Sequence, residues 1–362
     1  MPWVHNISLH DEPAPPIARI LTGREVRKFS YFQLLMIEVK DLTKTFRVHK
    51  KEPGLMGSVR SLFNRQWHEV HALKSVSLRI GAGEIVGIVG ANGAGKTTLV
   101  KCLAGILHPT SGSARVLGFN PWERRDGFRN QIALIMGQKA QLWWDLPAAD
   151  GFMLLREIYR IPKAEYLKSL EELVDTLQVA DQLTTQVRRL SLGERMKMEL
   201  IAALLHHPKV VFLDEPTIGL DLTAQRAIRD FLLRYREAHQ PAMLLTSHYM
   251  EDIERLCARI VIVREGEIVY DGGLQEVLSH YAPHKQLSLR WDPAPGEGLP
   301  SEIIPSSLGE IISYEPGTLK IKALRSKTAE VASLLLQRFP IADLNIEEED
   351  IGNIIEALIR KQ

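Results

Sequence analysis

Apolar residues recur along the middle of the chain with two spacings that alternate. Short runs with strand spacing predict strands at 37–40, 70–73, 76–80, 84–89, 132–136, 210–213, 242–245 and 260–264, the last in a hairpin with 269–270. Recurrence at every third or fourth position predicts helices at 96–106, over most of 150–206, and at 223–238 and 250–257. Strands that alternate with helices favour an α/β domain on a largely parallel sheet.

This pattern changes near residue 283, where prolines interrupt the apolar runs. Strands expected at 286–291, 311–314, 319–323 and 342–346, with helices at 328–339 and 351–360, predict a small α+β domain over 283–362 that carries no chemical motif. Residues 1–35 lack sustained periodicity, so we expect a disordered N-terminal extension there, with Met36 as a hypothetical native start. The main α/β domain then covers 36–282.

The composition and charge of the chain limit which functions are possible. The 362 residues are 45 % hydrophobic and carry a net charge of +1, which gives no overall attraction to nucleic acid or anionic lipid. Cys102 and Cys257 lie in helix-like apolar stretches and are predicted to be buried thiols in a reducing compartment. No apolar run approaches the roughly 18 residues of a membrane span, so a role at a membrane requires a partner. A basic insertion at 47–63 is either a surface loop or a contact for a membrane or partner.

A glycine-rich segment between a predicted strand and a predicted helix carries the first chemical motif. Residues 90–97 match G-x-x-x-x-G-K-[ST], the phosphate-binding loop. Its glycines let backbone N–H groups approach phosphate oxygens, Lys96 supplies a charge for the β- and γ-phosphates, and the Thr97 hydroxyl suits Mg²⁺. The expected nucleotide-binding residues here are Gly90, Ala91, Asn92, Gly93, Ala94, Gly95, Lys96, Thr97 and Thr98.

Two carboxylates follow the apolar run at 210–213. Asp214 suits Mg²⁺, directly or through water, and Glu215 can orient and polarise an attacking water. Alone, the pair is equally consistent with solvated carboxylates at a strand end, but a phosphate-binding loop in the same chain favours the catalytic interpretation. Gln138 and His248 each follow a predicted strand, where an amide can reach Mg²⁺ and water, and an imidazole the γ-phosphate.

A second candidate anion site lies at 190–195, where a helix is predicted to begin. Ser191 and Gly193 at a helix N-terminus can bind a phosphate group. Because one nucleotide does not need two γ-phosphate sites in one chain, we expect this site to serve the nucleotide of a second copy. An ordinary helix N-cap is the alternative. Asp221 is a turn residue that can reach across to that copy.

In their order, these motifs resemble those of the ABC ATPases over about 36–275. The resemblance implies a P-loop NTPase fold of the ABC cassette type, with a mostly parallel sheet core, an antiparallel β subdomain and a helical subdomain at about 139–206. It also implies a head-to-tail dimer with two ATP molecules between the chains. The implied assignments are Walker A at 90–98, the Q-loop Gln138, the signature at 190–194, Walker B Asp214, the catalytic base Glu215, the D-loop Asp221 and the switch His248, with Thr97, Gln138 and Asp214 toward Mg²⁺.

Three further residues bear on this resemblance. Phe46 lies where the family places an aromatic ring against adenine, although a core phenylalanine is the alternative. The signature departs from L-S-G-G-Q at Leu192 and Glu194. Leu192 is similar to exporter-type cassettes of the drug and polysaccharide group, and the small C-terminal domain resembles an accessory domain of exporter cassettes. Glu194, counted with Ser191 and Gly193 among the nucleotide-binding residues, adds a negative charge that can weaken γ-phosphate affinity or alter dimer closure.

The function implied is the ATP-hydrolysing subunit of an ABC transporter, an exporter, at the cytoplasmic face of the inner or plasma membrane. Two copies would close on ATP and move separate permease subunits, and no nucleic acid partner is expected. A soluble ABC ATPase acting on ribosomes or DNA is the alternative, and the single cassette and near-neutral charge count against it. A P-loop kinase or GTPase leaves the signature and His248 unexplained. Trp143 and Trp144 either anchor the permease or pack beneath the Q-loop.

Overall fold

The computed structural model describes residues 35–49, 67–137, 139–281, 284–292, 305, 308–338 and 340–348. The expected N-terminal extension up to residue 34, most of the basic insertion, Gln138 and the helix expected at 351–360 lie outside these residues. In the described part of the chain, no helix is long and apolar enough to cross a membrane.

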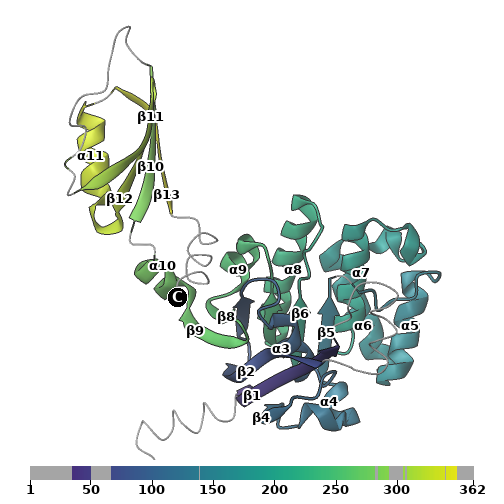
Figure 1. Cartoon of the computed structure of the whole chain (residues 1–362). Coiled ribbons are helices and arrows are strands. Elements are labelled where there is room, and N and C mark those ends of the chain that lie inside the picture. Colours follow the sequence, from purple (N-terminus) through teal and green to yellow (C-terminus); the bar gives the residue numbers. More distant parts are fainter. Residues whose placement is uncertain are drawn as a thin grey trace, which may run out of the picture.

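A six-stranded sheet forms the centre of the larger part of the molecule (Figure 1). Its strand order is β5-β6-β7-β3-β8-β9. Its strands are β3 (Ile85–Val89), β5 (Ile132–Met136), β6 (Val210–Asp214), β7 (Ala242–Thr246), β8 (Arg259–Arg264) and β9 (Glu267–Gly273). All pair in parallel except β9, which forms an antiparallel hairpin with β8. Every residue of β3, β6 and β7 is buried, which explains their continuous apolar runs and confirms the predicted α/β core.

Alternate side chains of these strands enter two separate cores, one on each face of the sheet. Val211 and Leu245 pack on the face covered by α7 (Leu192–Leu204), α8 (Leu222–His239), α9 (Met250–Leu256) and α10 (Leu274–Tyr281). Phe212 and Leu244 pack on the face covered by α3 (Lys96–Leu103) and the antiparallel sheet. Cys102 and Cys257 are buried in these cores, as predicted, and burial raises the pKa of the Cys102 thiol to about 11.

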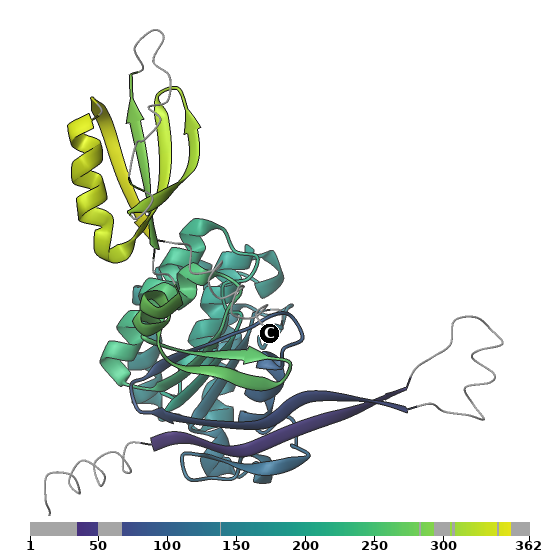
Figure 2. The same cartoon turned by 60° about the vertical axis from the view of Figure 1, so that its left-hand side comes forward.

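The antiparallel sheet consists of β1 (Leu35–His49), β2 (Trp67–Gly81) and β4 (Ser111–Val116), in the order β2-β1-β4. The short strands expected at 37–40, 70–73 and 76–80 are parts of two 15-residue strands, whose pairing continues to His49 opposite Trp67. Figure 2 shows this pair extending beyond the rest of the domain. The first residues of the expected insertion, 47–49, are therefore paired strand. Strand β4 was not predicted, because its sequence SGSARV has too few apolar residues to show a strand pattern.

The region from 139 to 206 is mainly helical, with α5 (Ala148–Tyr159), α6 (Lys163–Leu177) and α7. Two short 3₁₀ turns, η2 (Ala180–Gln182) and η3 (Val187–Arg189), interrupt it before α7. Between α3 and α5 lie η1 (Pro121–Glu123) and α4 (Asp126–Arg129). Phe152 of α5, Leu173 of α6 and Val187 of η3 pack into the core that also contains Val211 and Leu245. The three-to-four-residue spacing of apolar residues in α5 and α6 matches this one-sided packing.

A separate four-stranded antiparallel sheet follows α10, in the order β11-β12-β10-β13. Its elements are β10 (His284–Trp291), β11 (Gly309–Glu315), β12 (Thr318–Leu324), η4 (Arg325–Lys327), α11 (Thr328–Arg338) and β13 (Ile341–Glu348). Leu289 and Ile321 from the sheet pack with Val331 and Leu335 from α11, so this part has its own core (Figure 1). An α+β arrangement was predicted here.

Candidate functional site

The loop between β3 and α3 has the shape that a phosphate site requires. A Cβ atom at Gly90 would lie 2.2 Å from the carbonyl oxygen of Val263, and Gly95 has a φ of 111°. Only glycine fits these two positions without strain. Gly95 caps α3 without a side-chain hydrogen bond, so the first N–H groups of the helix are open to an anion.

Lys96 lies inside this loop. Its side chain is buried, and its ammonium group donates to the carbonyl oxygens of Gly90 (2.6 Å) and Ala91 (3.1 Å). Burial lowers the pKa of Lys96, while the nearby carboxylates of Glu215 and Asp214 act in the opposite direction. The loop is thus curled around a cation that faces two carboxylates.

Thr97 and Asp214 meet at the edge of the sheet although 117 positions separate them in the chain. The Thr97 hydroxyl donates to Asp214 Oδ1 at 3.0 Å, and the Thr246 hydroxyl donates to the same oxygen at 2.7 Å. Hard oxygen atoms in this arrangement fit Mg²⁺, which binds through carboxylate and hydroxyl groups. Thr246 was not predicted as a site residue, because its only signal was a hydroxyl residue at the end of an apolar strand.

Glu215 and His248 lie within hydrogen-bonding distance of each other beside this cluster. His248 Nε2 lies 2.6 Å from Glu215 Oε1. Strands β6 and β7 are parallel neighbours with Asp214 opposite Thr246, so the residues after both strands reach the same edge. Glu215 adopts a φ of 57°, and its N–H group donates to the carbonyl oxygen (3.0 Å) and hydroxyl (3.2 Å) of Thr246. This left-handed backbone turns the carboxylate toward His248.

The residues of the expected signature lie at a different place, where α7 and α8 begin. Ser191 is the N-cap of α7 and forms a capping box with Glu194: the Glu194 N–H group donates to the Ser191 hydroxyl at 3.3 Å, and the Ser191 N–H group donates to Glu194 Oε2 at 2.9 Å. The Ser191 hydroxyl also donates to Glu194 Oε2, at 2.8 Å. These hydrogen bonds lower the pKa of Glu194. A Cβ atom at Gly193 would lie 3.0 Å from Ala224 of α8. Asp221 caps α8 through Ala224, at 2.8 Å.

Within one chain, these residues therefore have the N-cap geometry that the sequence left as the alternative. Among the described residues, no hydrogen bond or ion pair joins Ser191, Glu194 or Asp221 to the cluster around Lys96. Leu192 is exposed at the start of α7. A role for this end toward another nucleotide requires a second chain.

The two remaining candidates are Phe46 and Gln138. Phe46 is half-buried on β1, outside the core clusters, and the Lys44 ammonium lies 5.0 Å from its ring centroid. Gln138 itself lies outside the described residues. The preceding residue, Gly137, donates its N–H group to the carbonyl oxygen of Asp214 at 2.9 Å. The chain therefore passes directly beside the metal candidate before it reaches position 138.

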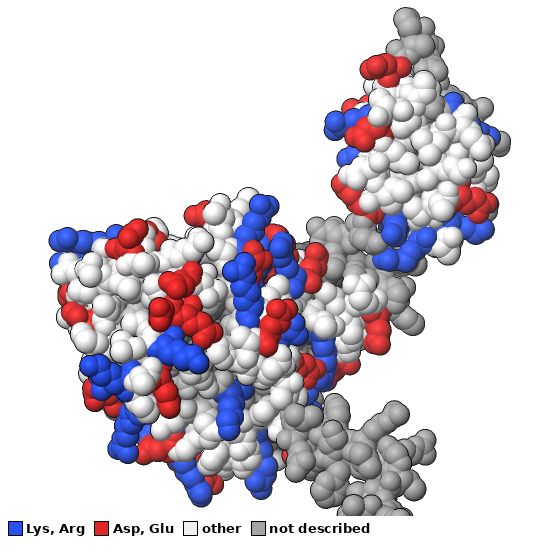
Figure 3. All heavy atoms as spheres, turned by 180° about the vertical axis from the view of Figure 1, so that it is seen from behind, with Lys and Arg blue, Asp and Glu red and all other residues white. Residues whose placement is uncertain are grey.

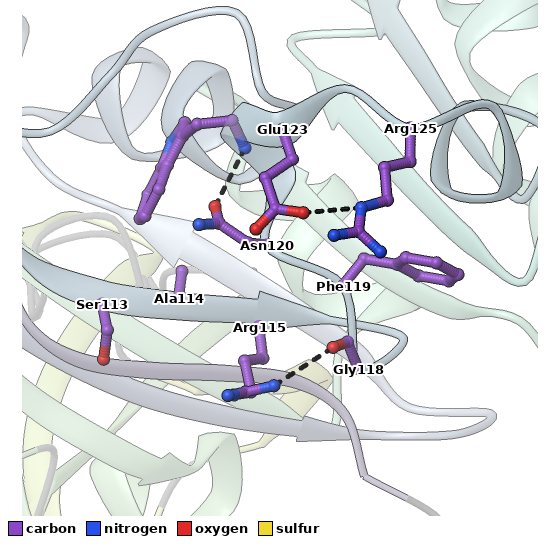
Figure 4. Close-up of a pocket in the computed structure, with 9 residues that line it drawn as sticks. Ser113, Ala114, Arg115, Gly118, Phe119, Asn120, Glu123 and Arg125 are labelled. Carbon is purple, nitrogen blue, oxygen red and sulfur yellow. Dashed lines mark hydrogen bonds and ion pairs between the residues drawn. The ribbon is translucent and has the colours of Figure 1, made fainter.

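A pocket of about 330 Å³ lies elsewhere, between β4 and η1 (Figure 4). Arg115 donates to the carbonyl oxygen of Gly118 across one side of it, and Arg125 pairs with Glu123 at 2.6 Å on the other. None of the motif residues lines it. The pocket therefore belongs to the antiparallel region and not to the candidate nucleotide site.

The fold and this cluster define the chain as a P-loop ATPase, with the phosphate loop, acidic strand end and histidine on one sheet edge. The sequence profile of the ABC transporter family matches residues 73–218, and that of the EvrA-like ABC transporter C-terminal domain matches 283–347. The ABC transporter ATP-binding protein NatA of Bacillus subtilis is 32 % identical over 208 residues, covering 58 % of this chain and 84 % of NatA. The chain belongs to the ABC transporter ATP-binding proteins.

Another relative and a solved structure support the same family. An uncharacterized ABC transporter ATP-binding protein of Nostoc is 30 % identical over 298 residues, covering 81 % of this chain and 85 % of that protein. The solved structure of an ATP binding subunit of an ABC transporter superposes with a TM-score of 0.56 at 25 % identity, covering 68 % of this chain and 93 % of that chain. The protein is thus an ATP-binding ABC ATPase, and the predicted class and fold are confirmed.

Proposed function

We propose that this chain powers a separate membrane permease, as the ATP-hydrolysing subunit of an exporter, by closing head to tail with a second copy around two ATP molecules. The observation that carries the chemical part is the convergence of Lys96, the Thr97–Asp214 pair and the Glu215–His248 pair at one edge of the sheet. Hydrolysis of a Mg²⁺-bound triphosphate requires groups of these kinds: a cation for the phosphates, oxygen ligands for the metal and a base for the water.

In this proposal, Lys96 and the loop N–H groups hold the β- and γ-phosphates, and Phe46 stacks on the adenine. Thr97 and Asp214, together with Gln138, would hold Mg²⁺, which neutralises phosphate charge when bound. Glu215 accepts a hydrogen bond from the attacking water and polarises it. His248 orients that carboxylate and contacts the γ-phosphate.

The second copy supplies the signature end. Ser191, Gly193 and Asp221 lie at the exposed starts of two helices, where N–H groups and a hydroxyl can meet the γ-phosphate held by the other chain. A solved dimeric structure of an ATP-binding cassette bound to ADP and Pi has this fold, with a TM-score of 0.55. A head-to-tail pair gives each nucleotide one P-loop and one signature.

A cleft of about 450 Å³ supports the permease part of the proposal. It lies beside β5 and the end of α5, and the side chains of Arg129, Lys139 and Tyr159 line it. Next to it, α5 exposes Met153, Leu154 and Ile158. A short helix of a permease with apolar and acidic side chains fits these walls.

The loop before α5 extends the same surface. Trp143 and Trp144 are 43 % and 51 % exposed, and the Arg195 guanidinium lies 5.3 Å from the Trp144 ring centroid. Exposure of two adjacent indoles favours an anchor for a partner over packing beneath the Q-loop. By contrast, Lys and Arg are interspersed with Asp and Glu on the face in Figure 3, and the net charge is +1, so nothing there favours nucleic acid.

Two features support export. Leu192 in the signature resembles exporter-type cassettes, and residues 283–362, which we propose to be an accessory domain, resemble by their sequence a domain appended to such cassettes. Relatives include methionine import proteins named MetN, one of them 31 % identical, so only a transport assay decides the direction. Loading of a candidate compound into inverted vesicles in the presence of ATP supports export, whereas accumulation in right-side-out vesicles contradicts it.

Glu215→Gln tests the chemical part. The variant keeps the shape of the side chain but loses the base, so it should bind ATP, accumulate as an ATP-bound dimer and lose hydrolysis by about 100-fold or more. Glu171→Gln, an exposed carboxylate on α6, is the matched control and should hydrolyse ATP at the wild-type rate. Wild-type turnover by Glu215→Gln would show that the base is another residue.

The partner is tested with the same trapped variant. We would purify Glu215→Gln from detergent-solubilised membranes of its native host and identify co-purifying proteins by mass spectrometry. A stoichiometric multi-span protein is expected, and it should be lost when Trp143→Ala and Trp144→Ala are added. Ribosomes or nucleic-acid factors from the soluble fraction would instead favour the soluble role.

A further inference from the structure

Asp252, in the first turn of α9, has a fully buried carboxylate that the proposed chemistry does not use. Its Oδ2 accepts hydrogen bonds from the hydroxyls of Thr217 and Ser247, the latter at 2.6 Å. Its Oδ1 accepts from Arg229 Nε at 2.5 Å. A buried charge with three donors is held in one orientation, because any rotation would leave donors unpaired in a medium of low dielectric constant.

The two hydroxyl donors belong to the two loops that carry the candidate chemistry. Thr217 is two residues after Glu215, and Ser247 immediately precedes His248. Both donors are buried, and the Ser247 hydroxyl also accepts from the N–H group of Tyr249 at 3.0 Å. One carboxylate oxygen therefore joins the loop after β6 to the loop after β7.

The cation behind Asp252 is fixed as well. Arg229 is 1 % exposed on α8, its Nη2 donates to Gln225 Oε1 at 3.1 Å, and its Nη1 lies 2.7 Å from Glu251. The carboxylate is thereby anchored to α8 and α9 at once. The loops with Glu215 and His248 are attached to this anchor and not only to the ends of their own strands.

We infer that Asp252 is a positioning residue for ATP hydrolysis, which sets the placement of Glu215 relative to His248 through Thr217 and Ser247. This inference rests on the proposed roles of Glu215 and His248. The Glu215 backbone is left-handed, with a φ of 57°, and its side chain lies 2.6 Å from His248. Displacing either loop by about 1 Å is enough to lower the rate of a chemical step by roughly 100-fold. The hydrogen bonds that Asp252 makes to both loops should therefore affect the rate of hydrolysis.

The experiment removes the hydroxyl donors and keeps the Arg229–Asp252 pair, so that the protein folds. Thr217→Val and Ser247→Ala should each lower the kcat for ATP in the full chain by about three- to tenfold, with the KM for ATP within about twofold of wild type. Thr217→Ser, which keeps the hydroxyl, should restore kcat. Asp252→Asn, where it folds, should lower kcat further.

Asp230→Asn is the matched control, because Asp230 pairs with Arg255 at 3.3 Å between the same two helices but on the exposed surface. It should leave kcat unchanged. Wild-type kcat in a folded Thr217→Val/Ser247→Ala protein would overturn the inference, and so would a Thr217→Ser protein as slow as Thr217→Val.

Glu215→Gln, measured in parallel, separates this inference from the function on which it rests. An inactive Glu215→Gln together with a fully active Thr217→Val/Ser247→Ala protein overturns only the positioning role. Wild-type turnover by Glu215→Gln overturns the proposed base, and the positioning role with it.

Discussion

Two ends of the proposed nucleotide site differ in how the chain builds them. Around Lys96, contacts join residues from distant parts of the sequence, such as Thr97 and Asp214, and the groups are mostly buried. At the start of α7, Ser191 and Glu194 lie three positions apart and bond each other at an exposed helix end. The first end is complete when one chain folds. At the second end, Ser191 and Glu194 already bond each other, so the Ser191 hydroxyl must give up this hydrogen bond to contact the nucleotide of a second chain.

The largest effect should follow a change at the first end. Lys96→Ala removes a buried cation that faces two carboxylates and is proposed to hold the phosphates, so ATP affinity should fall by about 100-fold or more. Equilibrium binding of a fluorescent ATP analogue measures it. Lys101→Ala, on the same helix, serves as the control and should bind as wild type. Unchanged ATP affinity in Lys96→Ala would show that Lys96 does not hold the phosphates.

A smaller and distinctive effect is expected at the second end. Ser191→Ala removes the hydroxyl proposed to reach the other chain's γ-phosphate, and hydrolysis by the homodimer should fall by about tenfold or more. In a mixed dimer with wild-type chains, one of the two sites should recover. Single-turnover hydrolysis of purified mixed dimers measures this. Full activity at both sites in the Ser191→Ala homodimer contradicts a role across the interface.

Glu194→Gln tests the effect of the carboxylate charge at the second end, the start of α7. Glutamine keeps the shape of the capping box but removes a charge from the proposed γ-phosphate site, so ATP-dependent dimerisation should strengthen by about two- to fivefold. Size-exclusion chromatography with light scattering at graded ATP concentrations measures it. Glu171→Gln removes the same charge from α6 and should have no effect. Weaker dimerisation in Glu194→Gln would mean that the carboxylate helps closure.

The smallest effect is on stability and depends on pH. The folded state lowers the pKa of Glu194 below its ordinary value of 4.5, so its ionised form stabilises the fold above that pH, and this contribution disappears as pH falls through the folded pKa. Wild type should be more stable than Glu194→Gln by about 0.5 kcal/mol at neutral pH, and the difference should shrink as the pH falls below 4.5. Denaturant unfolding over a series of pH values from neutral to acid measures it. A gap that persists in acid would exclude the carboxylate as its source.

Much of this site could be predicted from the sequence because each motif is local. The loop at 90–97 specifies its own glycines, lysine and threonine, and Asp214 and Glu215 mark the end of an apolar strand. Long-range partners left no local signal. Thr246, bound to both Asp214 and Glu215, and Asp252, bound to Thr217 and Ser247, were not identified as candidates.

The same limit applies to the fold. Buried parallel strands such as β6 were predicted because both faces are covered and the sequence there is uniformly apolar. Strand β4 was missed because it lies at a sheet edge with few apolar residues, and β1 and β2 were predicted too short because pairing between them, not local pattern, sets their length.

The class of this protein, its phosphate loop and the order of its catalytic candidates follow from the amino-acid sequence alone, because they depend on residues that are adjacent in the chain. The folded structure was needed to show that Glu215 lies beside His248, that Ser191 bonds Glu194, and that Asp252 joins the loops that follow β6 and β7. Those relations depend on which strands are neighbours in the sheet and which charges are buried together. No local pattern of residues encodes that.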